Sequence, residues 1–386
     1  MKYLITLTTI ALWFAACSGS DSYNDKSVRP DFDQLPVFEI ENQFTISTFN
    51  DGDFFGAVSQ VAVSDDQTIF VSDPHTRKIY MFDRDGEYRG YLGGEGEGPG
   101  EFRQIGSVSL LAPDTLHVVD WELARITLFS KTDGQWTAVN YFDRPDGARE
   151  YGSDIYFTFN SLYPHPDGYL GRFTSSFTPD DTAGHNFAYY TKFDYELNPV
   201  DDREYLMHVT SNPIVIRDPG RSVSVMGAPE GHRTLYANTG ESYKVSTWTG
   251  DNRITIRHIT EDDSTGFNFS SNRLPITEER KAELVEDRIP DPENARISRG
   301  EMSEYIPDYK GFSRQLIVDD QDRIWILARP FENEDPEWLI YSKDGDLLAA
   351  APHPGGTFRQ IKNNRIFTSL TTADQEPAFG VYEILE

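Results

Sequence analysis

This sequence of 386 residues contains only one cysteine, and that is its most informative compositional feature. Because Cys17 has no second cysteine to bond with, no disulfide can form within the chain. Basic residues are also few, since 35 Lys and Arg stand against 63 Asp and Glu, for a formal net charge of −28 at pH 7. A surface this acidic repels phosphate backbones, so we expect no nucleic acid among the partners. The apolar run at residues 3–16 is too short to span a bilayer.

Local signatures of catalysis and of ligand binding are scarce as well. The sequence has no G-x-S-x-G motif and no carboxylate pair at a diagnostic spacing. In the glycine-rich stretch 93–100, Pro99 takes the third glycine position of a G-x-G-x-x-G motif, and Gly94 takes the glutamate position of a calcium loop. The histidines, among them His75, His165, His185 and His232, have no zinc-site spacing. The sequence therefore predicts no catalytic residue, no metal site and no cofactor.

The N-terminal residues predict where in the cell the protein is located. Lys2 precedes the apolar run 3–16, and Phe14-Ala15-Ala16-Cys17 resembles a bacterial lipobox, in which small residues precede a cysteine that is acylated. Phe14 stands where leucine is usual, and an ordinary signal peptide with a chance cysteine is the alternative. We expect residues 1–16 to be a lipoprotein signal peptide, Cys17 the lipid attachment site and residues 17–36 a disordered tether. The lipid would then be the chain's only contact with the membrane.

Residues 68–102 carry the pattern that the rest of the chain repeats. Three apolar runs, IFVSD, KIYMFD and EYRGYL, are separated by turn residues, and Asp85-Gly86 supplies the positive φ that a hairpin turn needs. Six segments have the form strand, turn, strand: VAVSDDQTIFVSD, VSLLAPDTLHVVD, SLYPHPDGYLGRF, VSVMGAPEGHRTLYAN, LIVDDQDRIWILA and FRQIKNNRIFTSL. A third and a fourth strand follow most of them. The sequence therefore predicts an all-β fold, a six-bladed β-propeller of four-stranded antiparallel blades spanning residues 37–386.

Two features depart from the repeat. The last unit is one strand short, and we expect residues 44–48 to complete it, because an open propeller would leave an exposed sheet edge. The repeat also lapses at about residues 260–312, where Thr277 and the acidic residues after it predict a helix at 278–287. We expect a small helical insertion between blades 4 and 5, over or beside the channel mouth.

The pattern V-x-D-x(4)-K/R-I-x-x-F-D-x-D-G, followed by G-x-G-x-G-P-G-E-F, resembles NHL-type repeats. It lies between Asp73 and Phe102, with a weaker copy at residues 118–134, and is similar to six-bladed propeller lipoproteins common in Bacteroidota and related bacteria. The resemblance implies a protein anchored in the envelope of a Gram-negative bacterium, on the periplasmic or the surface face of the outer membrane. Asp73 with Arg77 or Lys78, and Asp120 with Arg125, recur in both copies, and we interpret them as ion pairs between strands.

The repeat places the candidate ligand-binding residues on one face. His75, Trp121, Arg172, His185 and Arg329 fall in or next to links between second and third strands, on the face where one blade connects to the next. Aromatic and guanidinium groups favour recognition of a protein, peptide or glycan over acid–base chemistry. The predicted function is a non-catalytic binding module of the cell envelope. The alternatives are a propeller lyase or hydrolase with a central-channel active site, and a structural subunit of an outer-membrane assembly.

Overall fold

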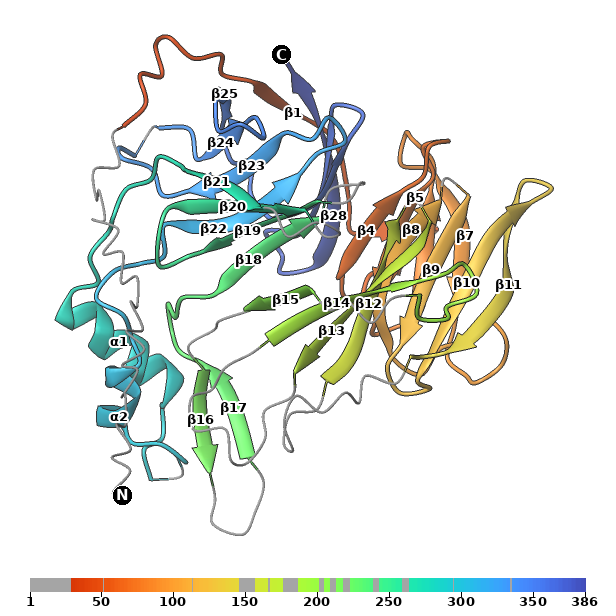
Figure 1. The fold of residues 1–386 in the computed structure, drawn as a ribbon, viewed down its shortest axis with the longest axis horizontal. Helices are drawn as coiled ribbons and strands as arrows, with labels where there is room; N and C mark the ends of the chain where they lie inside the picture. The colour runs from red at the N-terminus through yellow and green to blue at the C-terminus, as the bar shows by residue number, and fades with distance from the viewer. Residues whose placement is uncertain are drawn as a thin grey trace, which may run out of the picture.

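A computed structural model describes residues 29–386 except 51, 113, 146–156, 166, 176–186, 201–204, 209–212, 218–222, 239–242, 259–263, 294 and 334. Within these residues the chain forms six four-stranded antiparallel sheets, which confirms the predicted six-bladed propeller. The sheets follow one another around the molecule, with blades 1 and 2 on the right of Figure 1 and blades 4 and 5 at the upper left. No helix in the described part of the chain is long and apolar enough to cross a membrane.

Each blade runs outward from its innermost strand, which is the first strand named here. Blade 1 is β4 (Gln60–Val63), β5 (Ile69–Asp73), β6 (Lys78–Phe82) and β7 (Tyr88–Gly93). Blade 2 is β8 (Ile105–Ala112), β9 (Thr115–Asp120), β10 (Arg125–Thr132) and β11 (Gln135–Asp143). Blade 3 is β12 (Phe157–His165), β13 (Gly168–Ser175), β14 (Phe187–Phe193) and β15 (Tyr205–His208).

Blade 4 is β18 (Thr234–Asn238), β19 (Tyr243–Trp248), β20 (Arg253–His258) and β21 (Ser264–Asn268). Blade 5 is β22 (Ser313–Val318), β23 (Ile324–Ala328), β24 (Trp338–Tyr341) and β25 (Leu347–Ala351). Blade 6 is β26 (Thr357–Lys362), β27 (Arg365–Thr371), β28 (Pro377–Leu385) and, outermost, β1 (Glu39–Ile46). A short hairpin, β2 (Thr48–Phe49) with β3 (Asp53–Phe54), connects β1 to blade 1.

The local sequence explains the turns between strands. At the predicted hairpin of blade 1, the Gly86 amide donates to the Asp83 carbonyl at 3.1 Å, and Gly86 has a φ of +86°. The Asp83 carboxylate accepts from the amides of Asp85 and Glu87, both at 3.0 Å, so the side chain stabilises the turn that joins β6 to β7.

Apolar clusters join the faces of most neighbouring blades. Blades 1 and 2 meet at Phe70 and Trp136, whose rings lie 4.8 Å apart, and blades 5 and 6 at the stacked rings of Trp338 and Phe358, 4.5 Å apart. Phe102 is fully buried in the cluster between blades 1 and 2. Burial of large aromatic rings supplies most of the cohesion between such sheets.

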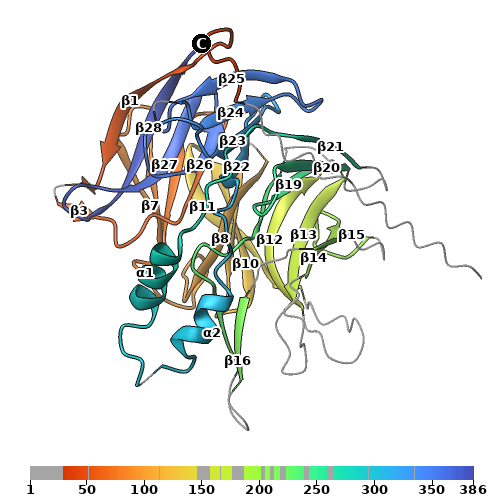
Figure 2. The ribbon, with the colours of Figure 1, turned by 90° about the vertical axis from the view of Figure 1, so that its left-hand side faces the viewer.

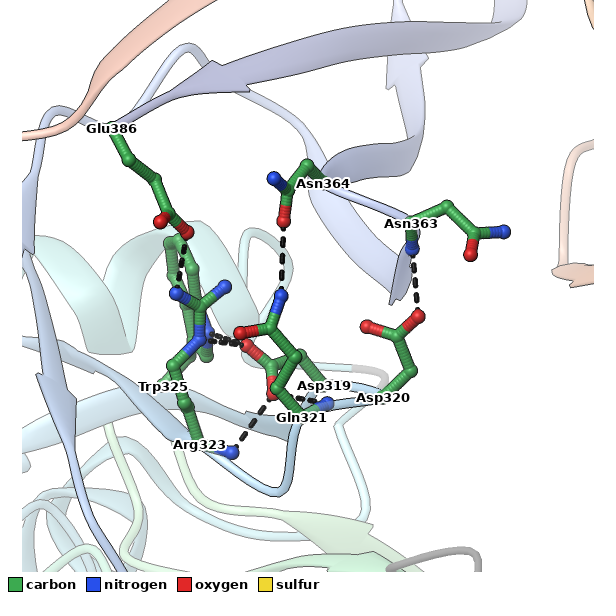
Figure 3. A network of polar contacts seen from close by, with 8 residues as sticks. All are labelled: Asp319, Asp320, Gln321, Arg323, Trp325, Asn363, Asn364 and Glu386. Atoms are coloured by element: carbon green, nitrogen blue, oxygen red, sulfur yellow. Dashed lines mark hydrogen bonds and ion pairs between the residues drawn. The ribbon is translucent and has the colours of Figure 1, made fainter.

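The ring is closed by the N-terminal strand. β1 pairs with β28 over its whole length, and Phe44 lies opposite Val381, which confirms the predicted closure of blade 6. On the face opposite the blade connections, the buried carboxylate of Asp319 accepts from the Trp325 indole at 2.8 Å and from Arg323 Nε at 2.6 Å (Figure 3). Arg323 also donates to Glu386 at 2.7 Å, and so connects blade 5 to the chain end that leaves blade 6.

Residues 29–38 are held against blade 5, although we expected residues up to 36 to belong to a disordered tether. The Ala350 amide donates to the Pro36 carbonyl at 2.9 Å, and the Phe38 amide donates to the Ala350 carbonyl at 2.8 Å. Arg29 forms a two-point ion pair with Asp335, whose side chain is 4% exposed. The rest of the predicted tether, the signal peptide and Cys17 lie outside the described residues.

The prediction for blade 4 was wrong by one strand. We expected residues 223–227 to begin the blade, but β17 (Val223–Gly227) pairs with β16 (Pro213–Arg217) in a separate hairpin. β18 is therefore innermost, and β21, which we had placed in the insertion, is the outer strand. The alternating pattern of β17 is the same in either place, so only tertiary pairing distinguishes them.

The insertion is helical, as predicted. It contains α1 (Glu278–Arg288), capped by the Thr277 side chain, and α2 (Arg299–Glu304), capped by Ser298 in a capping box with Glu301. Both helices lie beside the β16–β17 hairpin at one end of the molecule (Figures 1 and 2). Ile214 of β16 belongs to the same apolar cluster as Val285, Ile289 and Met302 of the insertion. We call the β16–β17 hairpin and residues 269–312 together the side module.

Candidate functional site

One face of the propeller carries the links between blades and the links between the second and third strands of each blade. Because the strands are antiparallel, the second and fourth strands of a blade end on the same side of the propeller, so both kinds of link lie on that face. The two kinds also touch, since the Trp121 amide donates to the Gln104 carbonyl at 3.0 Å. We call this the loop face.

Two buried carboxylates organise the loop face in blades 1 and 2. Asp73 is fully buried and accepts from the amides of Gly56, Ala57, His75 and Thr76 at 2.8–3.3 Å. Asp120 does the same for Arg103, Gln104, Glu122 and Leu123 at 2.8–3.3 Å. Neither carboxylate pairs with a described basic side chain, so the predicted ion pairs with Arg77, Lys78 and Arg125 are wrong. Each aspartate instead binds two consecutive links by backbone hydrogen bonds.

His75 and Trp121 occupy equivalent places just after these aspartates. His75 is exposed, and its Nδ1 lies 2.8 Å from the Gly56 carbonyl. Trp121 is 42% exposed and lies flat on Gly106, where an added Cβ would meet the indole Nε1 at 2.4 Å. Both side chains thus lie exposed on the loop face, and each needs a glycine beneath it.

The innermost strands add a feature that the sequence analysis missed. Strands β8, β12, β22 and β26 each have a bulge near the end that begins at the loop face. The bulged residues are Gly106, Asn160, Arg314 and Arg359. A bulge redirects one side chain out of the pleat. Here the side chains contact outer strands of their own blades, since Asn160 accepts from Thr174 of β13 and Arg359 donates to Ser369 of β27. The four bulges lie at equivalent places, near the loop-face ends of the inner strands of blades 2, 3, 5 and 6.

Two of the bulged residues are arginines in adjacent blades. Arg314 forms an ion pair with Glu337, its Nε is buried without an acceptor, and burial together with nearby Arg329 lowers its pKa. Arg359 is exposed and donates from Nε to Ser369 Oγ at 2.8 Å. The signal in the sequence was the dipeptide Arg-Gln, which occurs at the same position of the fifth and sixth repeats, as Arg314-Gln315 and Arg359-Gln360.

Arg329 lies on the loop face, where it holds the base of the insertion. Its Nε donates to the Gly311 carbonyl at 3.0 Å, its amide to Ser271 Oγ at 3.0 Å, and its Nη2 lies 3.7 Å from Glu230. Burial lowers the pKa of this guanidinium. His232 also meets the insertion, since its Nε2 lies 3.1 Å from the Tyr309 carbonyl.

We expected the insertion to lie over or beside the channel mouth, near the candidate residues, but among the described contacts only Arg329 of these residues meets it. Among the described residues, no hydrogen bond, ion pair or ring contact connects the insertion with His75, Trp121 or Arg172. Its apolar side chains pack on the hairpin that precedes blade 4, so the insertion and the hairpin stabilise each other. The insertion thus approaches the propeller at blades 4 and 5, through Arg329 and His232.

Arg172 lies between blades 3 and 4 rather than at the channel mouth. Its guanidinium stacks on the Tyr236 ring at 4.3 Å, and Lys244 of blade 4 stands 3.5 Å from the Tyr190 ring of blade 3. Burial, with a contribution from Arg172, holds the pKa of Lys244 well below its ordinary range. Among the described side chains, no apolar cluster spans these two blades, in contrast to the other five pairs of neighbours. Cation–π contacts replace aliphatic packing there.

The remaining predicted residue, His185, lies outside the described residues. In the part of the chain that the structure describes, no group of three His, Cys, Asp or Glu side chains is placed to hold a metal ion. His117, which the sequence did not single out, is fully buried, and its Nδ1 lies 3.0 Å from the Ser109 carbonyl while its Nε2 accepts from the Leu162 amide at 3.4 Å. It joins blade 2 to blade 3 and is not on the loop face.

Comparison with known proteins supports the architecture. Residues 47–164 are similar to the family described as DUF5128, 6-bladed beta-propeller. No curated protein sequence matches the chain. A member of the DUF4221 family from Bacteroides vulgatus has a TM-score of 0.50 at 8% identity, over 91% of this chain and 99% of that one.

Two further solved structures are similar over most of their length. A candidate exported protein from Bacteroides fragilis has a TM-score of 0.47 at 11% identity, covering 91% of this chain and 100% of that one. A gluconolactonase from Xanthomonas campestris has a TM-score of 0.37 at 13% identity, covering 89% of each chain. At these identities the similarities concern the fold alone, and the function must be argued from the site.

Proposed function

We propose that the protein is a lipid-anchored, non-catalytic binding module of the bacterial cell envelope, which receives a protein, peptide or glycan on its loop face. The observation that supports this most directly is that the loop face carries the exposed indole of Trp121, with the bulged residues Asn160, Arg314 and Arg359 near the loop-face ends of their inner strands. Trp121 lies on Gly106, the bulged residue of blade 2. Three of the four bulged residues, all except Gly106, carry polar side chains that can hydrogen-bond a ligand on the loop face.

The chemistry of these side chains favours binding over catalysis. Guanidinium, carboxamide and indole groups hydrogen-bond and stack, but they do not transfer protons at neutral pH. The described histidine nearest in the chain to a bulged arginine is His353, whose Nδ1 accepts from the Trp338 indole at 3.1 Å. Burial, together with Arg314, lowers the pKa of His353, which suits a neutral hydrogen-bond donor at its other nitrogen.

The anchor is a separate part of the proposal. Residues 29–38 are fixed to blade 5, and Cys17 precedes Arg29 by only twelve positions in the sequence. A lipid at Cys17 would therefore hold the propeller within about 40 Å of the bilayer surface, the reach of a fully extended chain of that length. Cys17→Ser should release the protein from membranes, and a variant that still sediments with them would contradict the anchor.

Binding can be tested by cross-linking in intact envelopes. Trp121→Ala should reduce the cross-linked product on the loop face, because the indole supplies an exposed flat surface there. Lys343→Ala, in the turn between the third and fourth strands of blade 5 on the opposite face, is the control and should leave the product unchanged. Equal cross-linking by both variants would contradict the loop face as the binding surface. Turnover of envelope glycans or peptides that Trp121→Ala abolishes would instead establish the enzyme alternative.

A further inference from the structure

We infer that an extended peptide segment of a partner protein, with lysine or arginine at alternate positions, docks along the outer edge of β1 and adds a fifth strand to blade 6. The inference does not depend on the proposed function, because β1 lies at the rim of the propeller whereas Trp121 belongs to blade 2.

A groove accompanies the first residues of this edge. It has a volume of about 720 Å³ and is lined by residues 37–41, by residues 333 and 335–337 of the link between β23 and β24, by Pro352 and His353, and by Leu385. Two of its apolar side chains are well exposed, Val37 at 47% and Leu385 at 40%. The volume is within the usual range of ligand sites, about 300–1,000 Å³.

The backbone of β1 is available for a further strand. β1 is the outermost strand of blade 6, and β28 is its one neighbour in the described sheets. Among the described residues, no backbone hydrogen bond outside that ladder involves residues 39–42. Alternate N–H and C=O groups of an edge strand point outward and can pair with an added strand. Because a bulge lies between Asn42 and Phe44, we expect regular pairing with residues 39–42.

The chain itself already places an extended segment on the neighbouring blade in this way. Val37 forms a parallel bridge with Ala350 of β25, whose amide and carbonyl pair with the Pro36 carbonyl and the Phe38 amide. Arg29 of the same segment forms a two-point ion pair with Asp335, which lines the groove. Strand addition combined with a basic side chain on a carboxylate is thus a binding mode that this rim supports.

The carboxylates that remain define the chemistry of the segment. Of the acidic residues in the described lining, Asp335 and Glu337 are already paired with arginines. Glu39 and Glu41 are exposed and have no basic partner among the described residues. They stand two positions apart in an extended strand, so both side chains lie on one face. Lysine or arginine at alternate positions of an added strand would lie opposite them.

The same charges disfavour two other occupants. A second copy of the chain would bring its own Glu39 and Glu41 to the edge, and like charges in opposite positions destabilise a strand pair. Residues 17–28, which precede the segment on blade 5, contain two aspartates and one lysine and are not basic. A basic segment of another protein is therefore the occupant with complementary charge.

The test measures fluorescence anisotropy of labelled hexapeptides, blocked at both ends, against the full chain in detergent. The peptide Lys-Val-Lys-Val-Lys-Val should bind saturably, and Glu-Val-Glu-Val-Glu-Val should not bind. Two N-methylated forms of the lysine peptide, one methylated at the lysine amides and one at the valine amides, keep the charge. One of the two should bind at least about tenfold more weakly, because alternate amides of an added strand face β1.

Variants of the chain locate the binding. Glu39→Gln and Glu41→Gln should each weaken binding of the lysine peptide about two- to fivefold, the effect of one cross-strand charge pair. Glu376→Gln is the matched control, since it removes one exposed carboxylate from the link between β27 and β28, outside the groove, and should leave the affinity unchanged. A photoreactive benzoylphenylalanine in place of one valine should cross-link to the groove, as mapped by mass spectrometry.

Several results would overturn the inference. These are equal binding of the lysine and glutamate peptides, full affinity of both N-methylated peptides, or unchanged affinity in Glu39→Gln and Glu41→Gln. Cross-links that map outside the groove would mean general attraction to an acidic surface. A dimer in sedimentation that the lysine peptide dissociates would assign the edge to a second copy instead. Trp121→Ala should not change peptide binding, so this inference and the proposed function fail separately.

Discussion

Replacement of Asp73 by asparagine should destabilise the whole propeller, although the side chain changes by one atom. Asp73 has no exposed surface, and its Oδ2 accepts from the Gly56 amide at 2.8 Å while its Oδ1 accepts from the amides of Ala57, His75 and Thr76. An amide group in place of Oδ2 would face the Gly56 donor with another donor. The carboxylate therefore cannot be exchanged for its neutral isostere without a loss of hydrogen bonds.

The magnitude follows from these four contacts. A buried amide left without an acceptor costs about 1–3 kcal/mol, and each of the other three bonds loses up to about 1 kcal/mol when its acceptor becomes neutral. The expected decrease in the free energy of unfolding is about 1–6 kcal/mol. Because Asp73 binds the link into blade 1 and the link between β5 and β6 at once, the effect should appear in the cooperative unfolding of the domain.

The assay is urea unfolding at pH 7, followed by tryptophan fluorescence and circular dichroism. The control is Asp85→Asn, at an exposed position of the turn between β6 and β7, which should change the free energy of unfolding by less than about 0.5 kcal/mol. A decrease below about 1 kcal/mol for Asp73→Asn, with an unchanged urea dependence, would refute the view that this carboxylate holds the two links together.

Three further predictions concern other parts of the fold. Burial lowers the pKa of His117 to about 4, whereas the pKa in the unfolded chain is about 6.5. The folded state is therefore favoured fully above pH 6.5, and the free energy of unfolding should decrease by about 3 kcal/mol as the pH falls from 6.5 to 4. His117→Gln should flatten the pH dependence of the urea midpoint in that window, and an unchanged dependence would contradict this role. Deletion of residues 29–49 removes β1 and should cause aggregation through the exposed edge of β28; a stable monomer in sedimentation would show that closure is dispensable. Met302→Ala leaves a cavity in the apolar core of the side module, where Met302 is fully buried. It should accelerate proteolysis of the insertion while the propeller remains resistant, and equal sensitivity of both parts would mean that they unfold together.

The sequence determined those features that depend on neighbours in the chain. Alternating apolar residues and Asp-Gly turns specify antiparallel hairpins, and six of them with one missing strand specify a ring closed by the N-terminus, as β1 and β28 confirm. Thr277 and the acidic residues after it specify the start of α1, because a cap acts on amides within the next turn. The places of His75 and Trp121 followed from the repeat in the same way.

Only the tertiary structure decided which residues meet across blades. The strand pattern of β17 fits an inner blade strand or a hairpin equally well, and its pairing with β16 is a contact that local sequence does not encode. Asp73 and Asp120 were placed correctly but given the wrong partners. A sequence shows which basic side chains are near an aspartate in the chain, but it does not show which backbone amides the carboxylate reaches in the fold. The bulges at Arg314 and Arg359 arise from the register between neighbouring strands, and that register is fixed only when the sheets twist and close.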